Sequence, residues 1–184
     1  MSKPLQMPMF SPQTEWVPPL NLPDLKEYSE IAIDLETRDP NLMTMGSGSV
    51  RGDGEVVGIA IAVEGWSGYF PIAHEAGGNM DRGLVLDWFE EVLHTDATKI
   101  FHNAMYDVSW IRALGFQIRG GIIDTMIAAS LVNENRWSFT LDSISKEFIG
   151  MGKNEKILAE AAKAWGVNPK AEMWRLPAPL VGEY

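Results

Sequence analysis

The 184-residue sequence contains no cysteine. This absence excludes disulfide bonds, thiolate zinc sites, iron–sulfur clusters and cysteine nucleophiles, and it is compatible with a reducing compartment. Only three histidines are present, and they are too scattered along the chain for a histidine-built metal site. Any metal ion is therefore expected to be held by oxygen ligands, which favour hard divalent cations such as Mg²⁺ and Mn²⁺.

Long apolar runs are also missing. No stretch of eighteen apolar residues is present, so the sequence predicts no membrane-spanning helix and no membrane partner. The first residues lack the apolar core of a secretory signal, and we expect a cytoplasmic protein.

Positive charge is scarce in this chain. Lysine and arginine number 15 against 25 aspartates and glutamates, which gives a net charge of −10. A protein that attracts polyanions over long range would be basic, so this mode of nucleic-acid binding is not expected. Two explanations remain for the excess carboxylates: a solvated acidic surface, or carboxylates that converge on divalent cations whose charge inverts the local field.

The first 23 residues differ in composition from the rest. More than half of the 11 prolines lie there, and proline is incompatible with a helix interior or a central strand. We interpret residues 1–23 as an extended N-terminal arm, with Trp16 and Leu20 as candidates for docking on the body. The remaining residues, 24–184, have the length of one domain.

Hydrophobic periodicity predicts an α/β fold. Short apolar runs indicate five strands, over residues 31–35, 56–63, 69–72, 99–102 and 122–123. Helical periodicity follows over residues 84–93, 104–114, 124–133, 139–149 and 155–165, with a further helix after Pro177. Residues 37–55 are rich in glycine, serine and aspartate and are interpreted as a long loop. The expected architecture is a mixed sheet of three antiparallel and then two parallel strands, flanked by helices.

Acidic residues follow two of these strands. Asp34 and Glu36 end the first strand two positions apart, which places both side chains on one face. Two like charges side by side need a compensating cation, unless the strand has already ended and both lie in water. Asn103 and Asp107 share one face at the start of a helix, although Asn103 is also a suitable N-cap.

The two pairs are more informative together than apart. Carboxyl ends of neighbouring parallel strands form the usual site of α/β sheets, so Asp34, Glu36 and Asp107 are expected to meet. Three such carboxylates make the core of a site for two divalent cations, Mg²⁺ or Mn²⁺, about 3.5–4 Å apart. Sites of this kind hydrolyse phosphodiesters, and they need neither cysteine nor a basic surface.

The segments that carry these residues resemble a known family. IAIDLET and HNAMYDVSWI are similar to the first two motifs of the DEDD 3′–5′ exonucleases, which have a ribonuclease H-like fold. With five further segments, the sequence resembles the proofreading domain of bacteriophage-type family A (DNA polymerase I-like) enzymes from Ile31 onward. The segments are DLETRDPNL, GDGEVVGIAIAV, GYFPIAHEAGGNMD, IIDTMIAASLVNEN and FTLDSISKEFIG.

The resemblance implies roles for these residues. Asp34, Glu36 and Asp107 would ligate or orient the metals, and Thr37 would help to hold the terminal nucleotide. Asn103 would support the substrate or a metal-bound water. The implied partner is the single-stranded or frayed 3′ end of DNA, with a polymerase domain or a separate polymerase chain alongside. A phage-encoded protein of this family would act in the host cytoplasm.

The third family motif, Y-x-x-x-D, matches this sequence in part. Tyr184 fits its tyrosine, which would orient the attacking water, and the fourth carboxylate would fall beyond the sequence. We therefore expect residues 24–184 to be a C-terminally truncated domain of low activity, with Tyr184 frayed. Asp124 is another acidic candidate for the site, although a role as helix N-cap is the favoured explanation. Two alternatives remain: a non-catalytic DNA-binding or polymerase-docking module of the same fold, and a ribonuclease D-like enzyme that trims RNA.

Overall fold

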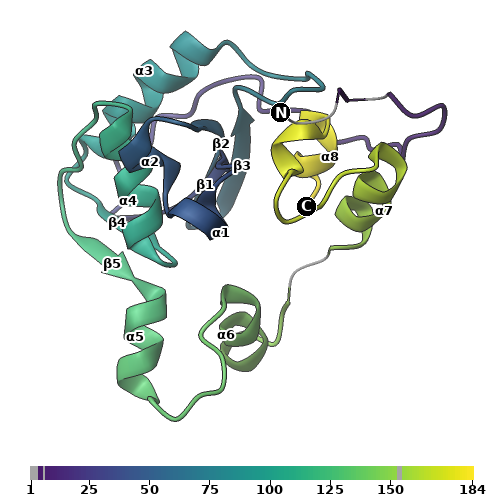
Figure 1. Ribbon diagram of the computed structural model, residues 1–184. Coiled ribbons are helices and arrows are strands. Elements are labelled where there is room, and N and C mark those ends of the chain that lie inside the picture. Colours follow the sequence, from purple (N-terminus) through teal and green to yellow (C-terminus); the bar gives the residue numbers. More distant parts are fainter. Residues whose placement is uncertain (1–3, 6, 153–154) are drawn as a thin grey trace.

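The structure, a computed structural model, describes residues 4–5, 7–152 and 155–184 (Figure 1). Its strands are β1 (Glu30–Arg38), β2 (Glu55–Val63), β3 (Trp66–Pro71), β4 (Thr98–Phe101) and β5 (Ile122–Asp124). They form one sheet in the order β3-β2-β1-β4-β5. β1–β2 and β2–β3 are antiparallel, whereas β1–β4 and β4–β5 are parallel. The predicted α/β class and mixed sheet are confirmed.

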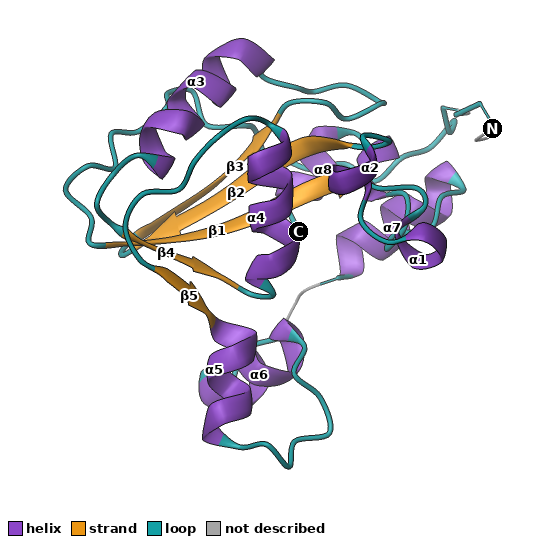
Figure 2. Ribbon diagram, turned by 60° about the vertical axis from the view of Figure 1, so that its left-hand side comes forward, coloured by secondary structure: helices purple, strands orange, loops and turns teal. Residues whose placement is uncertain are grey.

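Helices flank this sheet. They are α1 (Leu42–Met45), α2 (Gly48–Arg51), α3 (Arg82–Leu93), α4 (Ala104–Ala113), α5 (Thr125–Val132), α6 (Leu141–Phe148), α7 (Lys156–Trp165) and α8 (Ala178–Gly182), with a 3₁₀ turn at Met173–Arg175. In both ribbon views, α5 and α6 extend away from the sheet beyond β5 (Figures 1 and 2). None of the described helices has both the length and the apolarity needed to cross a bilayer.

The segment 37–55 is more ordered than predicted. Its first and last residues belong to β1 and β2, and α1 and α2 lie between them. The Ser47 side chain accepts a hydrogen bond from the Ser49 N–H at the start of α2, and Gly52 ends that helix in the left-handed conformation. Each of these helices is a single turn and too short for a hydrophobic period, so the sequence pattern could not reveal them.

Alternation along β1 separates the core from the polar residues. Ile31, Ile33 and Leu35 are buried in a core that includes residues of α3 and α4. Asp34 and Glu36 occupy the alternate positions, which confirms the prediction that they share a face. The opposite layer is a second core, formed by α7, α8 and Tyr69 of β3.

The N-terminal arm contacts this second core. The Trp16 ring lies 6.1 Å from the Tyr69 ring, and it covers Gly182 so closely that a Cβ there would overlap it. Thr14 also donates a hydrogen bond to Glu183. The docking prediction for Trp16 is therefore confirmed. The docking prediction for Leu20 is wrong, because that side chain is 94% exposed. Positions 1–3 and 6 of the arm lie outside the described residues.

His74 connects β3 to the C-terminal segment. Its ring is 3% exposed, and its Nδ1 lies 3.1 Å from the Leu176 carbonyl oxygen. A carbonyl only accepts, so Nδ1 donates to it, and Nε2 is left to accept from the Tyr69 hydroxyl at 2.5 Å. Burial lowers the pKa of His74 to about 4, against a smaller opposing effect of the Leu176 hydrogen bond.

We expect His74 to make folding stability depend on pH. Its folded pKa lies below the unfolded value, so its contribution is complete above about pH 6.5 and is lost as pH falls towards 4. Relative to a His74→Gln variant, the wild type should lose about 2 kcal/mol of unfolding free energy between about pH 7.5 and pH 5. Urea unfolding of both proteins measures this difference, and a pH-independent difference would contradict the prediction.

Candidate active site

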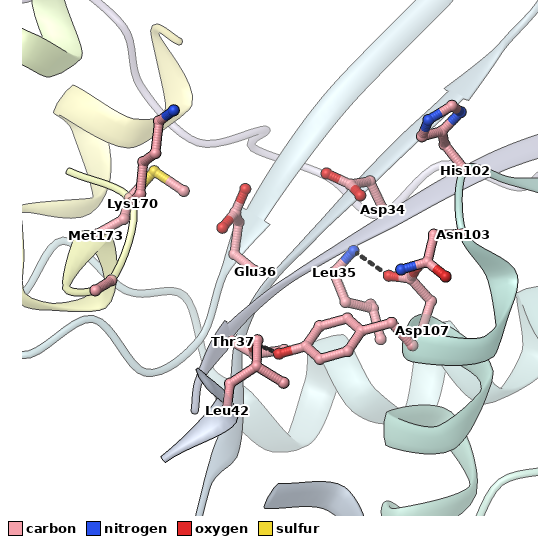
Figure 3. Close-up of a pocket in the computed structure, with 12 residues that line it drawn as sticks. Asp34, Leu35, Glu36, Thr37, Leu42, His102, Asn103, Asp107, Lys170 and Met173 are labelled. Carbon is pink, nitrogen blue, oxygen red and sulfur yellow. Dashed lines mark hydrogen bonds between the residues drawn. The ribbon is translucent and has the colours of Figure 1, made fainter. Parts of the chain in front are cut away.

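One pocket of about 280 Å³ brings the sequence-predicted polar residues together. Its lining includes Asp34, Glu36 and Asp107 together with Thr37 and Asn103 (Figure 3). The other lining residues are Leu35, Leu42, His102, Tyr106, Lys170, Ala171 and Met173. The pocket lies where β1 and β4 end, as the rule for parallel strands predicted.

Asp107 enters this pocket beyond the point where the pairing of β1 with β4 ends. The parallel pairing of β1 with β4 stops at Ala32 and Ile100. Beyond that point the Leu35 N–H donates to Asp107 Oδ1 at 3.0 Å, in place of a ladder hydrogen bond (Figure 3). Because Leu35 lies between Asp34 and Glu36, this bond ties the α4 carboxylate to the part of β1 that carries both of them.

Negative charge is concentrated at this point. Asp107 is 3% exposed, and its pKa is raised to about 7, first by burial and then by the charge of Asp34. The Leu35 N–H acts in the opposite direction without cancelling these effects. A cation in the pocket would offset both the burial of the Asp107 charge and its repulsion by Asp34. Carboxylate oxygens are the donors that a hard divalent cation prefers.

The pocket offers oxygen donors for a metal ion without a preformed metal-binding group among its described residues. Among the residues that the structure describes, no three histidine, aspartate or glutamate side chains converge into a ready metal-binding group. Asp34, Glu36 and Asp107 share a pocket and have the donor chemistry for a divalent cation, and as ligands they stay a prediction.

Asn103 has an unusual backbone. Its φ of 71° makes it the only non-glycine residue with positive φ in the described part of the chain. Asn103 occupies the N-cap position of α4, as the alternative explanation of this residue stated, but its side chain makes no capping hydrogen bond. Strain of this kind costs of order 1–3 kcal/mol, and it is often found at functional sites.

Asp124 holds the strained turn in place. Its carboxylate accepts from the backbone N–H of Asn103 at 3.1 Å and of Ala104 at 2.8 Å, and it also caps α5 through Met126 N–H at 2.9 Å. The N-cap prediction for Asp124 is confirmed. Its hydrogen bonds to the start of α4 were not predicted. Burial alone would raise the pKa of Asp124, but these N–H donors lower it overall.

Tyr106 and Asp39 were missed by the sequence analysis. The Tyr106 hydroxyl lies 2.6 Å from Thr37 Oγ1 and donates to Asp39 at 3.3 Å. This chain of hydroxyls fixes Thr37, and a β-bulge between Glu36 and Thr37 shifts the pairing with β2 at the same point. The only indication in the sequence that Tyr106 lies near the site was its position directly before Asp107.

Tyr184 lies near the site without lining the same pocket. It borders a second cavity of about 600 Å³ that Asp34 and Glu36 also line. Its backbone N–H donates to the Val181 carbonyl at 3.1 Å, and its side chain packs on the second core. The structure therefore shows a half-buried Tyr184 in place of the frayed residue that we expected.

We expect an Asp107→Asn substitution to stabilise the metal-free protein. The amide keeps an acceptor for the Leu35 N–H and removes the buried charge. A carboxyl whose folded pKa is raised reduces stability at high pH, and this loss fades as pH falls through about 7. At about pH 8 in EDTA, the variant should exceed the wild type by about 2–4 kcal/mol, and by far less near pH 5. Urea unfolding tests this, and a constant difference across pH would contradict it.

Known proteins with related sequences carry the same region. A 3′–5′ exonuclease family model matches residues 22–176. A DNA-directed DNA polymerase of Pseudomonas phage M6 is 35% identical over 98% of this chain and 28% of its own length. The DNA polymerase DpoZ of Salmonella phage PMBT28 is 30% identical over 78% of this chain and 21% of its own length. The chain thus spans about a quarter of these relatives.

Solved structures agree on the fold. Brucella melitensis NrnC with bound Mg²⁺ superimposes with a TM-score of 0.52 at 20% identity, over 84% of this chain and 83% of its own. Escherichia coli RNase D gives a TM-score of 0.52 at 15% identity, over 82% of this chain and 36% of its own length. The ribonuclease H-like fold is confirmed. From the family match and the phage relatives together, the chain belongs to the 3′–5′ exonuclease domain family of DNA polymerases.

Proposed function

We propose that this chain hydrolyses the terminal phosphodiester at the 3′ end of DNA, with two divalent cations, Mg²⁺ or Mn²⁺, held by Asp34, Glu36 and Asp107. The observation that carries the proposal is the shared pocket of the three carboxylates at the ends of β1 and β4, with Asp107 buried beside Asp34. Divalent cations supply Lewis-acid chemistry that activates water and stabilises charge on the phosphate and the leaving oxygen.

The chain's own residues bind and orient the substrate in this proposal. The Thr37 hydroxyl, fixed by Tyr106, would hold the terminal nucleotide. The Asn103 side chain, presented by the strained turn, would contact the substrate or an ordered water. Tyr184, on the side of the second cavity, would orient the attacking water.

DNA is the proposed substrate because the phage relatives are named as DNA polymerases. Proofreading in the cytoplasm of a host cell, beside a polymerase domain or chain, is the setting that we propose. The pocket must reach a free end, so single-stranded or frayed DNA fits better than duplex.

Asp34→Ala is the direct test of catalysis. With a labelled single-stranded oligodeoxynucleotide and Mg²⁺ or Mn²⁺, the wild type should release 5′-mononucleotides from the 3′ end. The variant should lose this activity by about 10³-fold, because a ligand of the cations is removed. EDTA should abolish cleavage by the wild type.

A matched control separates the site from net charge. Asp87 is an exposed aspartate of α3, so Asp87→Ala removes the same charge outside the pocket and should cleave like the wild type. Equal cleavage by wild type and Asp34→Ala would leave the non-catalytic module as the function. An RNA strand degraded faster than DNA would favour the ribonuclease D-like alternative.

Asn103→Gly separates the backbone role of this residue from its side-chain role. Glycine adopts positive φ without strain, so the unfolding free energy should stay equal or rise by up to about 1 kcal/mol. Cleavage should fall at least about tenfold, since the amide that supports the substrate is gone. Urea unfolding and the oligonucleotide assay measure the two effects, and full activity in a stable variant would remove Asn103 from the substrate site.

A further inference from the structure

A segment distant in sequence from the carboxylates forms part of the pocket. Lys170, Ala171 and Met173 line it together with the ends of β1 and α4. Figure 3 shows Lys170 and Met173 beside Glu36, with Asn103 and Asp107 on the other side. This segment, residues 168–173, is here called the pocket wall.

Local hydrogen bonds give the pocket wall a fixed shape. Asn168 Oδ1 accepts from the N–H groups of Lys170 at 2.9 Å and Ala171 at 3.1 Å. The Asn168 N–H donates to the Glu172 carboxylate at 3.0 Å, and the Glu172 N–H returns a bond to the Asn168 carbonyl at 2.8 Å. The backbone at Lys170 is thereby set by the segment itself.

Longer-range contacts fasten the pocket wall to the sheet. The Arg175 guanidinium is 5% exposed and donates to Glu75 at 2.8 Å and to Glu172 at 3.2 Å. Next to it, the Trp174 ring stacks under the Arg38 guanidinium, 5.0 Å away, at the end of β1. The pocket wall is therefore held at the same strand end that carries Asp34 and Glu36.

Lys170 is the only lysine or arginine among the described residues that line the pocket. Its side chain is exposed, and no carboxylate of the described chain lies within ion-pair distance of its ammonium group. The chain as a whole has a net charge of −10, so an approaching nucleic acid meets mostly repulsion. A single positive group beside the carboxylates is then the place for a phosphate.

We propose that Lys170 binds a backbone phosphate of the substrate strand beside the carboxylate pocket. The proposal rests on the proposed function, since it identifies a nucleic-acid strand as the ligand. The contact is one of charge and position, without readout of the base.

The test is the salt dependence of binding. A labelled single-stranded oligodeoxynucleotide is titrated in EDTA by fluorescence anisotropy, in an Asp34→Asn background that prevents cleavage. Adding Lys170→Ala should weaken binding about fivefold at about 50 mM salt. The slope of log K against log salt should fall in magnitude by about 0.7, the value for one lost phosphate contact on a single strand. Lys170→Arg should keep the slope.

Lys26→Ala is the matched control. Lys26 is an exposed lysine that precedes the amino end of β1, whereas the pocket lies at the carboxyl end of that strand. Its loss removes the same charge and should leave the slope unchanged. Identical slopes for Lys170→Ala and the background protein, or equal effects of Lys170→Ala and Lys26→Ala, would overturn the proposal. If Lys170→Ala changes the slope but the wild type releases no nucleotides in the separate cleavage assay, the Lys170 contact stands and the nuclease function is rejected.

Discussion

The hydrogen bond from the Leu35 N–H to Asp107 determines the arrangement of the whole site. The parallel ladder between β1 and β4 ends three residues earlier, and a buried N–H beyond that point needs an acceptor. By accepting this bond, Asp107 joins α4, which packs on the first core, to β1. The polar side chains of β1, Asp34 and Glu36, lie on the opposite face of the sheet. The same contact gives β1 a hydrogen-bond partner and brings a carboxylate of α4 into the pocket that Asp34 and Glu36 also line.

The concentration of negative charge in the pocket reduces the folding stability of the chain. Burial and the charge of Asp34 both favour protonation of Asp107, so the folded chain holds its carboxylates under repulsion. Asn103 adds backbone strain at the start of α4, and Asp124 offsets it with bonds to Asn103 and Ala104. Backbone strain and a carboxyl with a raised pKa in the same pocket are typical of functional sites. In the proposed function, bound cations would invert the local field and let an acidic protein act on a polyanion without a basic surface.

The strand directions and the carboxylate pocket were predictable because they follow from simple rules of strand geometry. Period-two alternation placed Asp34 and Glu36 on one face, and the rule for parallel strand ends brought Asp107 to them. The single-turn helices α1 and α2 were missed, since one turn is too short to show a period. Lys99 is fully buried although lysine is rarely found inside proteins. Its ammonium donates to the carbonyls of Thr95, Ala97 and Arg119.

Contacts between distant segments were beyond the reach of periodicity. Thr37, Tyr106 and Asp39 come together only after β1 and α4 have packed, and sequence spacing gives no measure of that distance. The same holds for Lys170, which follows Asp34 by more than a hundred residues and enters the pocket through the Arg175–Glu75 and Arg38–Trp174 contacts. Local patterns thus identify the residues that carry charge at strand ends. Long-range packing decides which further side chains meet them, and here it adds one positive charge to a pocket of negative ones.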